Sequence, residues 1–211
     1  MRENSSAAQG CQGSEPGFTT PTPQDMHVDD TKISFENPLN ERMRTLLRLE
    51  FMFAQLAFAV QGDSTWEARY ALQSYFELVN AISRGELKTD LLQELDRHHA
   101  NLTRLAETPG VDPSVLKETL DQISETRGAL DGAKLISREM IGQNEFLTSL
   151  RQRAGIPGGT CNFDLPALHY WLELNPAETR WEHMREWSQP FQPLVDTVSL
   201  LLGMIGRRRA P

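Results

Sequence analysis

The sequence predicts a mainly α-helical protein, a bundle of about eight helices with a short strand near its N-terminal end. Apolar residues recur every three or four positions through most of the chain after Pro38. Turn signals such as Gly62-Asp63, Gly85 and Thr108-Pro109-Gly110 separate these patterned stretches. Only Lys32–Glu36 alternates apolar and polar residues as a strand does. The hydrophobic fraction of 39% is large enough for a sizeable core.

Three segments are expected along the 211 residues: a disordered extension (1–30), a helical domain (31–206) and a basic end (207–211). The first segment is rich in Ser, Gly, Gln, Pro and Thr, so it buries too little apolar surface to offset the entropy of ordering. Lys32–Glu36 needs a partner strand, because a lone strand is not stable. No later segment has a strand pattern, so we expect this one to remain unpaired.

The first two helices are predicted to be amphipathic partners. The first begins at Pro38 and continues to about Val60, with residues at helical spacing at Leu39, Met43, Leu46, Leu47, Glu50 and Phe51. Ser64 and Glu67 have the spacing of a capping box that opens the second helix. That helix is expected to turn its large residues inward and to end at Gly85: Trp66, Tyr70, Leu72, Phe76, Val79 and Ile82.

The third and fourth helices lie on either side of the Thr108–Gly110 turn. The third is expected to start near Thr89-Asp90 and to carry a leucine-rich face: Leu91, Leu92, Leu95, Leu102 and Leu105. Asp112 and Pro113 supply an N-cap and a proline at the first helical position of the fourth. Its apolar positions are Leu116, Leu120, Ile123 and Leu130.

Shorter helices fill the rest of the chain. The fifth is predicted over Ile141–Arg153, and Ile156–Gly159 breaks it. Asp164 is predicted to cap the sixth, whose apolar residues are Leu165, Leu168, Trp171, Leu172 and Leu174. Asn175-Pro176 is predicted to end this helix and to begin a seventh helix, which carries Trp181, Met184 and Trp187. After a break at Ser188–Pro193, the last helix spans Leu194–Ile205.

Composition narrows the class of protein. The net charge of −8, from 29 acidic and 21 basic residues, argues against general binding to nucleic acid or anionic lipid. Two cysteines, Cys11 and Cys161, do not form a disulfide framework, which fits a reducing compartment. The N-terminus has no apolar h-region, so a secretory signal is not expected. The longest apolar stretches, Phe51–Val60 and Leu200–Ile205, fall short of the ~20 residues that span a bilayer. We therefore predict a cytoplasmic protein without membrane insertion.

The sequence contains few candidates for catalytic or metal-binding groups, and each of them has a simpler structural explanation. His98 and His99 are adjacent, about 100° apart on a helix, so they cannot share one metal, and a solvated or edge position is favoured. Cys161, Asp164 and His169 suggest a nucleophile, but no hydrolase signature accompanies them. Gly158-Gly159 matches no nucleotide-binding motif. We predict no metal, no cofactor and no enzymatic activity.

Arginines are the remaining functional candidates. Arg44 and Arg48 are four residues apart on the first helix and project together, whereas Arg42 is offset by about 200°. Arg151 and Arg153 flank the end of the fifth helix. Paired guanidinium groups can hold carboxylates through forked hydrogen bonds. The alternative is a solvated face on which these arginines pair with Glu41 or Glu50, and spacing alone favours it.

Four stretches of sequence resemble the ZapD family: Phe35–Phe51, Glu94–Arg97, Pro109–Asp112 and, most specifically, Arg151–Leu172 with its IPGGTCNFDLPALHYWL run. The resemblance extends from about residue 32 to residue 205. It implies a helical domain joined to a small β domain, a dimer, and no catalytic activity. It also implies binding to the C-terminal tail of FtsZ, the tubulin-like division protein, and bundling of FtsZ filaments in the division ring at midcell.

The family's basic tail-binding pocket is matched here by Arg44, His169 and Arg48. With Arg151 and Arg153, these residues form the expected FtsZ-tail site. The chain departs from the family in two ways: it is about one helical turn shorter after Gln143, where the family has a further arginine, and it ends at Pro211, where the family continues into strands. Those strands would pair with Lys32–Glu36. The alternatives to an FtsZ-binding adaptor are a helical scaffold that lost FtsZ binding and a hydrolase that uses Cys161 and His169.

Overall fold

The computed structural model describes residues 37–38, 40–83, 86–134 and 141–205, and within these the fold is mainly α-helical, as predicted. The predicted strand, the N-terminal extension and the basic C-terminal end lie outside the described residues. The elements in chain order are α1 (Glu41–Val60), α2 (Thr65–Ile82), α3 (Leu87–Arg104), η2 (Leu105–Glu107), α4 (Pro113–Gly132), α6 (Glu145–Ala154), α7 (Pro166–Leu174), α8 (Ala177–Ser188), η3 (Gln189–Phe191) and α9 (Gln192–Met204).

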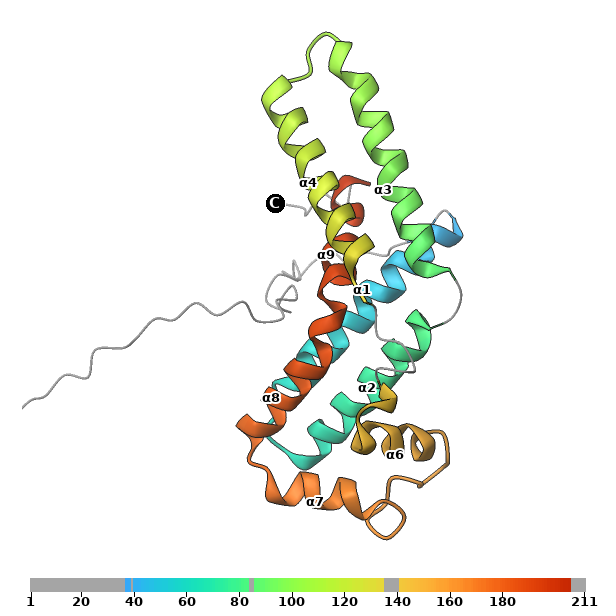
Figure 1. Cartoon of the computed structure of the whole chain (residues 1–211), viewed down its shortest axis with the longest axis vertical. Helices are drawn as coiled ribbons and strands as arrows, with labels where there is room; N and C mark the ends of the chain where they lie inside the picture. Colours follow the sequence, from blue (N-terminus) through green and yellow to red (C-terminus); the bar gives the residue numbers. More distant parts are fainter. Residues whose placement is uncertain (1–36, 39, 84–85, 135–140, 206–211) are drawn as a thin grey trace, which may run out of the picture.

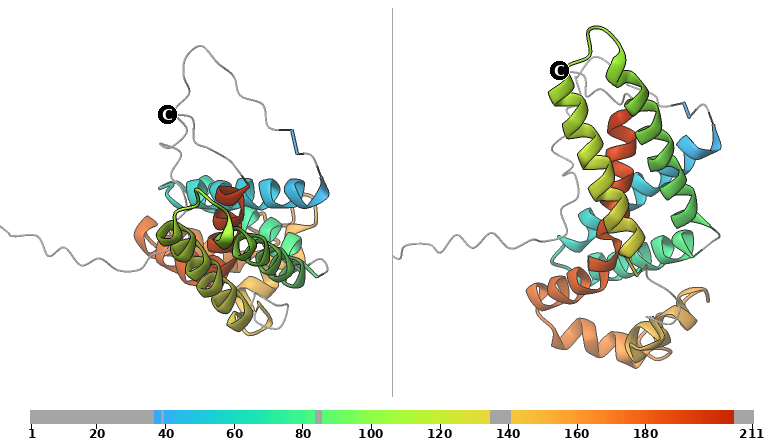
Figure 2. Two further views of the ribbon diagram at one scale, coloured as in Figure 1. Left: turned by 90° about the horizontal axis from the view of Figure 1, so that it is seen from above. Right: turned by 45° about the horizontal axis from the view of Figure 1, so that its top comes forward.

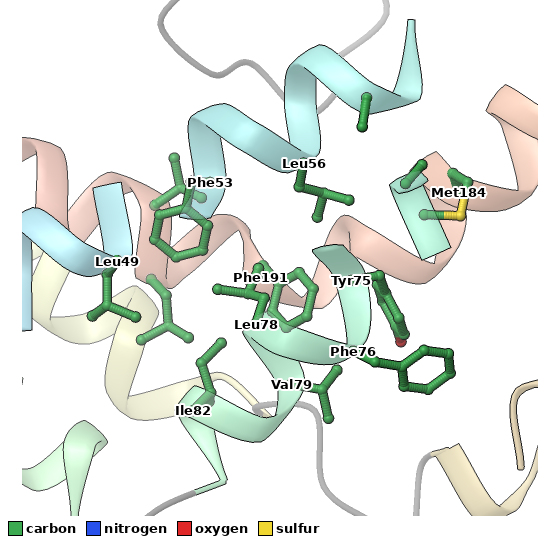
Figure 3. Close-up of a cluster of buried hydrophobic side chains, with 14 of the residues drawn as sticks. Leu49, Phe53, Leu56, Tyr75, Phe76, Leu78, Val79, Ile82, Met184 and Phe191 are labelled. Atoms are coloured by element: carbon green, nitrogen blue, oxygen red, sulfur yellow. The ribbon is translucent and has the colours of Figure 1, made fainter. Parts of the chain in front are cut away.

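The core lies where α1 and α2 pack on each other and on α8, η3 and α9 (Figures 1 and 3). Phe191, from the short 3-10 helix η3, is fully buried between side chains of α1 and α2 (Figure 3). Its ring centroid lies 5.6 Å from that of Tyr75, which contacts Phe76 edge-on at 5.3 Å. Burying each large apolar side chain contributes about 1.5–3 kcal/mol. The same burial raises the pKa of Tyr75 to about 12.

A helical hairpin of α3 and α4 projects from this body, and α4 also packs on α9 (Figure 1). Fully buried residues such as Leu95, Ile123 and Leu130 hold its base. Leu105 and Val115, nearer its tip, are exposed. Arg127 bridges the two helices through hydrogen bonds of 2.6 and 3.3 Å to the carboxylate of Asp96.

Two of the predicted helix starts are confirmed in detail. Ser64 and Glu67 form a reciprocal capping box, in which the Glu67 backbone N–H donates to Ser64 Oγ at 3.1 Å. Asp112 accepts from the Ser114 backbone N–H at 2.8 Å, ahead of Pro113. Hydrogen bonds from Ser64 and from Ser114 lower the pKa values of Glu67 and Asp112 respectively. Both carboxylates are thus held ionised at helix N-termini, where negative charge is favourable.

The predicted cap of the sixth helix is wrong. The N-cap of α7 is Leu165, with no side-chain hydrogen bond, and Pro166 occupies the first helical turn. The residue before a proline is disfavoured in the helical region, and Leu165 accordingly has φ −135° and ψ 72°. Asp164 therefore lies one residue too early to cap. Its carboxylate instead accepts from Cys161 Sγ at 3.8 Å and lies 3.9 Å from Arg153 Nη1.

Four other helix starts differ from the predicted ones. α1 begins at Glu41 and not at Pro38, because Asn40 is its N-cap. α3 begins at Leu87, ahead of Thr89-Asp90. The predicted fifth helix corresponds to α6, which starts only at Glu145, because Asn144 accepts from the Leu147 backbone N–H at 3.0 Å and caps it. The last helix starts at Gln192, because the predicted break is the 3-10 turn η3, which leads directly into α9.

Five large apolar residues that were expected on inward faces are exposed. These are Phe51 (68%), Trp66 (77%), Tyr70 (43%), Leu105 (43%) and Leu174 (75%). Their spacing is helical, but the buried stripe of each helix is set by the neighbours that pack on it. On α1 that stripe follows Leu49, Phe53 and Leu56, and Phe51 points away from it.

Candidate functional site

Arg44 and Arg48 come together on the exposed face of α1, as their spacing predicts. The backbone N–H of Met43 donates to Asn40 Oδ1 at 2.8 Å and fixes the start of the helix. Arg44 Nη1 then donates to Glu41 Oε2 at 2.6 Å, and Arg48 Nη1 lies 3.9 Å from the other oxygen, Oε1. One carboxylate thus lies between two guanidinium groups.

All three side chains of this group remain accessible to solvent. Their exposed fractions are 46% for Arg44, 68% for Arg48 and 70% for Glu41. Exposed ion pairs of this kind contribute little to stability, about 0–1 kcal/mol. The alternative of arginines paired with Glu41 therefore agrees with the structure, and the pairing is weak enough for another carboxylate to compete with it.

Exposed aromatic residues continue the same face of α1. Phe51 and Phe58 are 68% and 63% exposed. At 100° per residue they fall within about 40° of Arg44 around the helix axis, as Arg48 does. We call Arg44, Arg48, Phe51 and Phe58 the α1 face. It combines positive charge with aromatic surface on one helix.

Arg42 lies on a different side of α1 from Arg44 and Arg48, as predicted, and forms an ion pair with a buried carboxylate on α3. Arg42 Nη1 donates to Glu94 Oε2 at 3.0 Å, and Arg97 Nη2 donates to Glu94 Oε1. Glu94 is only 5% exposed. His98 Nε2 lies 3.4 Å from Glu94 Oε1 but is buried without hydrogen-bond geometry to it. A buried carboxylate requires such partners, so this cluster anchors the start of α1 to α3.

The other predicted site residues lie in a second group, around α6 and α7. Arg153 is near Asp164, as described above, and Arg151 is half-buried. His169 is also half-buried, on α7, with its ring centroid 6.2 Å from that of Tyr170. The interactions of the described residues do not include an ion pair for Arg151.

The structure does not bring the two groups together. The start of α1 lies beside the base of the α3–α4 hairpin, whereas α6 and α7 form the opposite end of the molecule (Figures 1 and 2). The right-hand view of Figure 2 shows the same separation. Within one chain, His169 is therefore not beside Arg44.

The residues of the hydrolase alternative are not arranged as a catalytic pair. Cys161 Sγ is directed to Asp164, and the hydrogen bonds among the described residues include none between Cys161 and His169. In the same part of the chain, no group of three His, Cys, Asp or Glu side chains lies close enough to hold a metal ion. None of the described helices is long and apolar enough to cross a membrane.

Sequence reasoning missed two features of the α1 region. It assigned Phe51 to the apolar face of the first helix and did not single out Phe58, although both follow Arg44 at intervals of seven residues, which is a signal for one helix face. It also did not identify Glu94 as the partner of Arg42. No local pattern could have found it, because the two residues are 52 positions apart.

Comparison with known proteins identifies relatives over most of the chain. The profile of a family described as ZapD, cell division protein, matches residues 47–211. A cell division protein ZapD from Chromobacterium violaceum is 40% identical over 173 residues, which cover 82% of this chain and 68% of that protein. ZapD proteins of Ralstonia pickettii and Klebsiella pneumoniae are 41% and 39% identical, over 82% and 83% of this chain and 68% and 70% of their own lengths.

Proposed function

Since this chain belongs to the ZapD family of cell division proteins, we propose that it binds the C-terminal tail of FtsZ and cross-links FtsZ filaments. In this role it is a non-enzymatic adaptor that stabilises the division ring at midcell, in the cytoplasm. Two tail-binding sites are needed to join two filaments, and a homodimer supplies them.

The observation that carries the proposal is the carboxylate of Glu41 between Arg44 and Arg48. A peptide carboxylate can take the same position, because an exposed pair of this kind is weak. Forked, charge-assisted hydrogen bonds to two guanidinium groups then give the tail both affinity and orientation. Binding of short acidic motifs by arginine clusters is a common recognition mode.

Phe51 and Phe58 give the α1 face a second kind of contact. An exposed aromatic ring beside an arginine pair can receive an apolar side chain of the peptide while the arginines hold its charge. This combination separates the α1 face from an ordinary solvated arginine surface. The buried Glu94 supports it indirectly, because its bond to Arg42 fixes the first turn of α1.

Arg151, Arg153 and His169 enter the proposal as a second and weaker contact. The carboxylate of Asp164 already neutralises part of the charge of Arg153. Because this group lies on α6 and α7, away from the start of α1 (Figure 1), we expect its replacement to reduce tail binding less than replacement of Arg44 does.

Tail binding is tested directly with a fluorescent peptide of the FtsZ C-terminal tail, by anisotropy at low salt. We expect Arg44→Glu to weaken binding at least tenfold, because it removes one guanidinium and adds a repelling carboxylate. Arg104→Glu is the matched control: the same reversal on an exposed arginine in the last turn of α3, away from the α1 face. It should bind as the wild type does.

Four outcomes would contradict this proposal. Equal loss in both variants would mean that only net charge matters, and equal binding by wild type and Arg44→Glu would place the tail elsewhere. A wild type that binds no peptide while remaining helical would favour the alternative of a scaffold without FtsZ affinity. Turnover of a substrate that a thiol reagent abolishes would instead favour the hydrolase.

A further inference from the structure

A carboxylate of the chain itself already lies at the arginine pair of the α1 face. Arg44 Nη1 donates to Glu41 Oε2 at 2.6 Å, and Arg48 Nη1 lies 3.9 Å from Glu41 Oε1. The Glu41 side chain is 70% exposed, so these two contacts, and not burial, direct it towards the arginines. A peptide carboxylate that binds the same guanidinium groups therefore meets one that is already bound.

The backbone that carries Glu41 is fixed from two directions. The preceding residue, Asn40, caps the helix, and its Oδ1 accepts from the Met43 backbone N–H at 2.8 Å. The following residue, Arg42, donates to the buried carboxylate of Glu94 on α3 at 3.0 Å. Because its point of attachment is fixed, the Glu41 carboxylate reaches the arginines by side-chain rotation alone. Its effective concentration there is on the order of millimolar or more.

The two arginines are engaged to different degrees. The contact of Arg44 at 2.6 Å is a charge-assisted hydrogen bond, whereas the separation of 3.9 Å at Arg48 is an ion pair too long for a hydrogen bond. Arg48 is also the more exposed of the two side chains, 68% against 46%. An incoming carboxylate therefore meets less competition at Arg48, where it binds first, and then takes the place of Glu41 at Arg44.

We propose that Glu41 is an intramolecular competitor that holds down the affinity of this arginine pair for peptide carboxylates. A peptide that engages Arg44 must displace the Glu41 carboxylate, so its affinity is reduced by the fraction of chains in which the pair is unoccupied. An exposed ion pair changes an equilibrium constant by up to about fivefold, so the reduction is modest. That the peptide is the FtsZ tail rests on the proposed function, whereas the competition itself depends only on the α1 face.

Displacement of Glu41 is readily reversed because this residue lies in the first turn of α1. Negative charge is favourable near a helix N-terminus, whether or not the carboxylate contacts the arginines. The exposed side chain also turns into water without the loss of a buried contact. Glu41 thus lowers the affinity of the α1 face without closing it.

Under the proposed function, weak binding of a single tail suits a protein that joins filaments. A filament displays many tails, so a protein with two sites gains avidity from it even when each site is weak. A free FtsZ subunit offers one tail and gives no avidity. By keeping each site weak, Glu41 favours filaments over free subunits as partners.

Anisotropy of the fluorescent FtsZ tail peptide at low salt tests this role. Glu41→Gln keeps the size of the side chain and removes its charge, so it should strengthen tail binding about threefold. Glu118→Gln is the matched control, because it neutralises another exposed carboxylate, on α4. It should leave the affinity as in the wild type. Far-UV circular dichroism verifies that both variants are folded.

A double-mutant cycle separates competition from general charge repulsion. Because Arg44 makes the hydrogen bond to Glu41, most of the gain from Glu41→Gln should disappear in a chain that also carries Arg44→Gln. A gain of equal size in both chains would show that Glu41 acts only through its charge, and would overturn the proposal. No gain from Glu41→Gln, where Arg44→Glu still abolishes tail binding, would overturn it and leave the proposed function standing.

Glutarate, a small dicarboxylate, tests the competition without FtsZ. Nuclear magnetic resonance of the arginine Nε–H groups follows its binding, which should be about threefold tighter in Glu41→Gln than in the wild type. This result in a chain that binds no tail peptide would uphold the competition and contradict the proposed function. Equal binding of glutarate by both proteins would overturn the competition, whatever the tail peptide does.

Discussion

The α1 face and the outer side of α7 (Phe163, Pro166, Ala167, Tyr170 and Leu174, which we call the α7 face) are both exposed to solvent, yet they differ in chemistry. The α1 face consists of two arginines and two phenylalanines along one helix, and the carboxylate of Glu41 lies beside both arginines. The α7 face places aromatic and aliphatic residues together with one charge, Glu173. Their helices also begin differently: a side chain of Asn40 caps α1, whereas no side chain caps α7.

This difference indicates two kinds of partner. Charge-assisted contacts on an open helix suit a short, mobile, acidic peptide, whose binding is reversible and sensitive to salt. A nearly uncharged aromatic surface suits a folded partner that excludes water from it. The first three predictions below test whether the two faces act independently, in order of decreasing expected effect, and the last two test the helix caps.

The largest effect is expected from reversing both arginines of the α1 face. Arg44→Glu with Arg48→Glu should weaken binding of the FtsZ tail peptide about a hundredfold, because two forked contacts are replaced by repulsion. The sedimentation coefficient should not change. Anisotropy and sedimentation on the same samples measure both quantities, and a loss of the dimer in this variant would show that the faces are coupled.

The converse variant removes aromatic surface from the α7 face. Phe163→Ser with Tyr170→Ser should weaken the dimer at least tenfold and reduce pelleting of FtsZ filaments to background. Affinity for the isolated tail peptide should stay within twofold of the wild type, because each chain keeps its α1 face. Helicity should be preserved, since both residues are exposed. If peptide affinity fell in parallel with dimerisation, the tail site would include residues from both copies.

Salt should separate the two faces in the wild-type protein. Exposed charges are screened over ~8–10 Å near physiological ionic strength. Raising sodium chloride from about 50 mM to about 500 mM should therefore weaken tail binding several-fold. The dimer dissociation constant should change less than twofold or decrease, because apolar association does not depend on charge. Titration of the peptide and sedimentation at both salt concentrations make this comparison.

A smaller effect is expected from substitutions at the starts of α1 and α7. Asn40→Ala should lower the free energy of unfolding by about 1 kcal/mol, as loss of an N-cap does. Asp164→Ala should change it by less than about 0.5 kcal/mol, because Asp164 does not cap α7 and surface substitutions are usually small. Urea denaturation measures both values. A loss for Asp164→Ala as large as that for Asn40→Ala would contradict the assignment of Leu165 as the N-cap.

Low pH should destabilise the two helix N-termini at which a carboxylate takes part in the cap, those at Glu67 and Asp112. The pKa values of Glu67 and Asp112 are lowered in the folded protein, so each group contributes stability above its ordinary pKa, 4.5 and 3.8 respectively. That contribution is lost as the pH falls through the lower, folded values. Thermal melting should therefore show a decreasing midpoint below about pH 4.5. Substitution of Glu67 by Gln should make this decrease shallower.

The sequence correctly predicted the interactions that form between residues within one turn of a helix. The capping box at Ser64, the N-cap at Asp112 and the i, i+4 pair of Arg44 and Arg48 each involve neighbours three or four residues apart or closer. Backbone geometry fixes such contacts before any tertiary packing. The prediction of Asp164 as an N-cap was wrong by one residue, because Pro166 determines where α7 begins.

The sequence alone thus determined the helical class, several helix starts and the family, since periodicity, caps and a long specific motif are all local in the chain. Tertiary structure decided which side of each helix is covered. The exposure of Phe51 and Leu174, the bond between Arg42 and Glu94, and the separation of His169 from Arg44 all depend on neighbours far away in sequence. The spacing of apolar residues along a helix is the same whether another helix or solvent covers them. Only the packed structure shows which of them are buried.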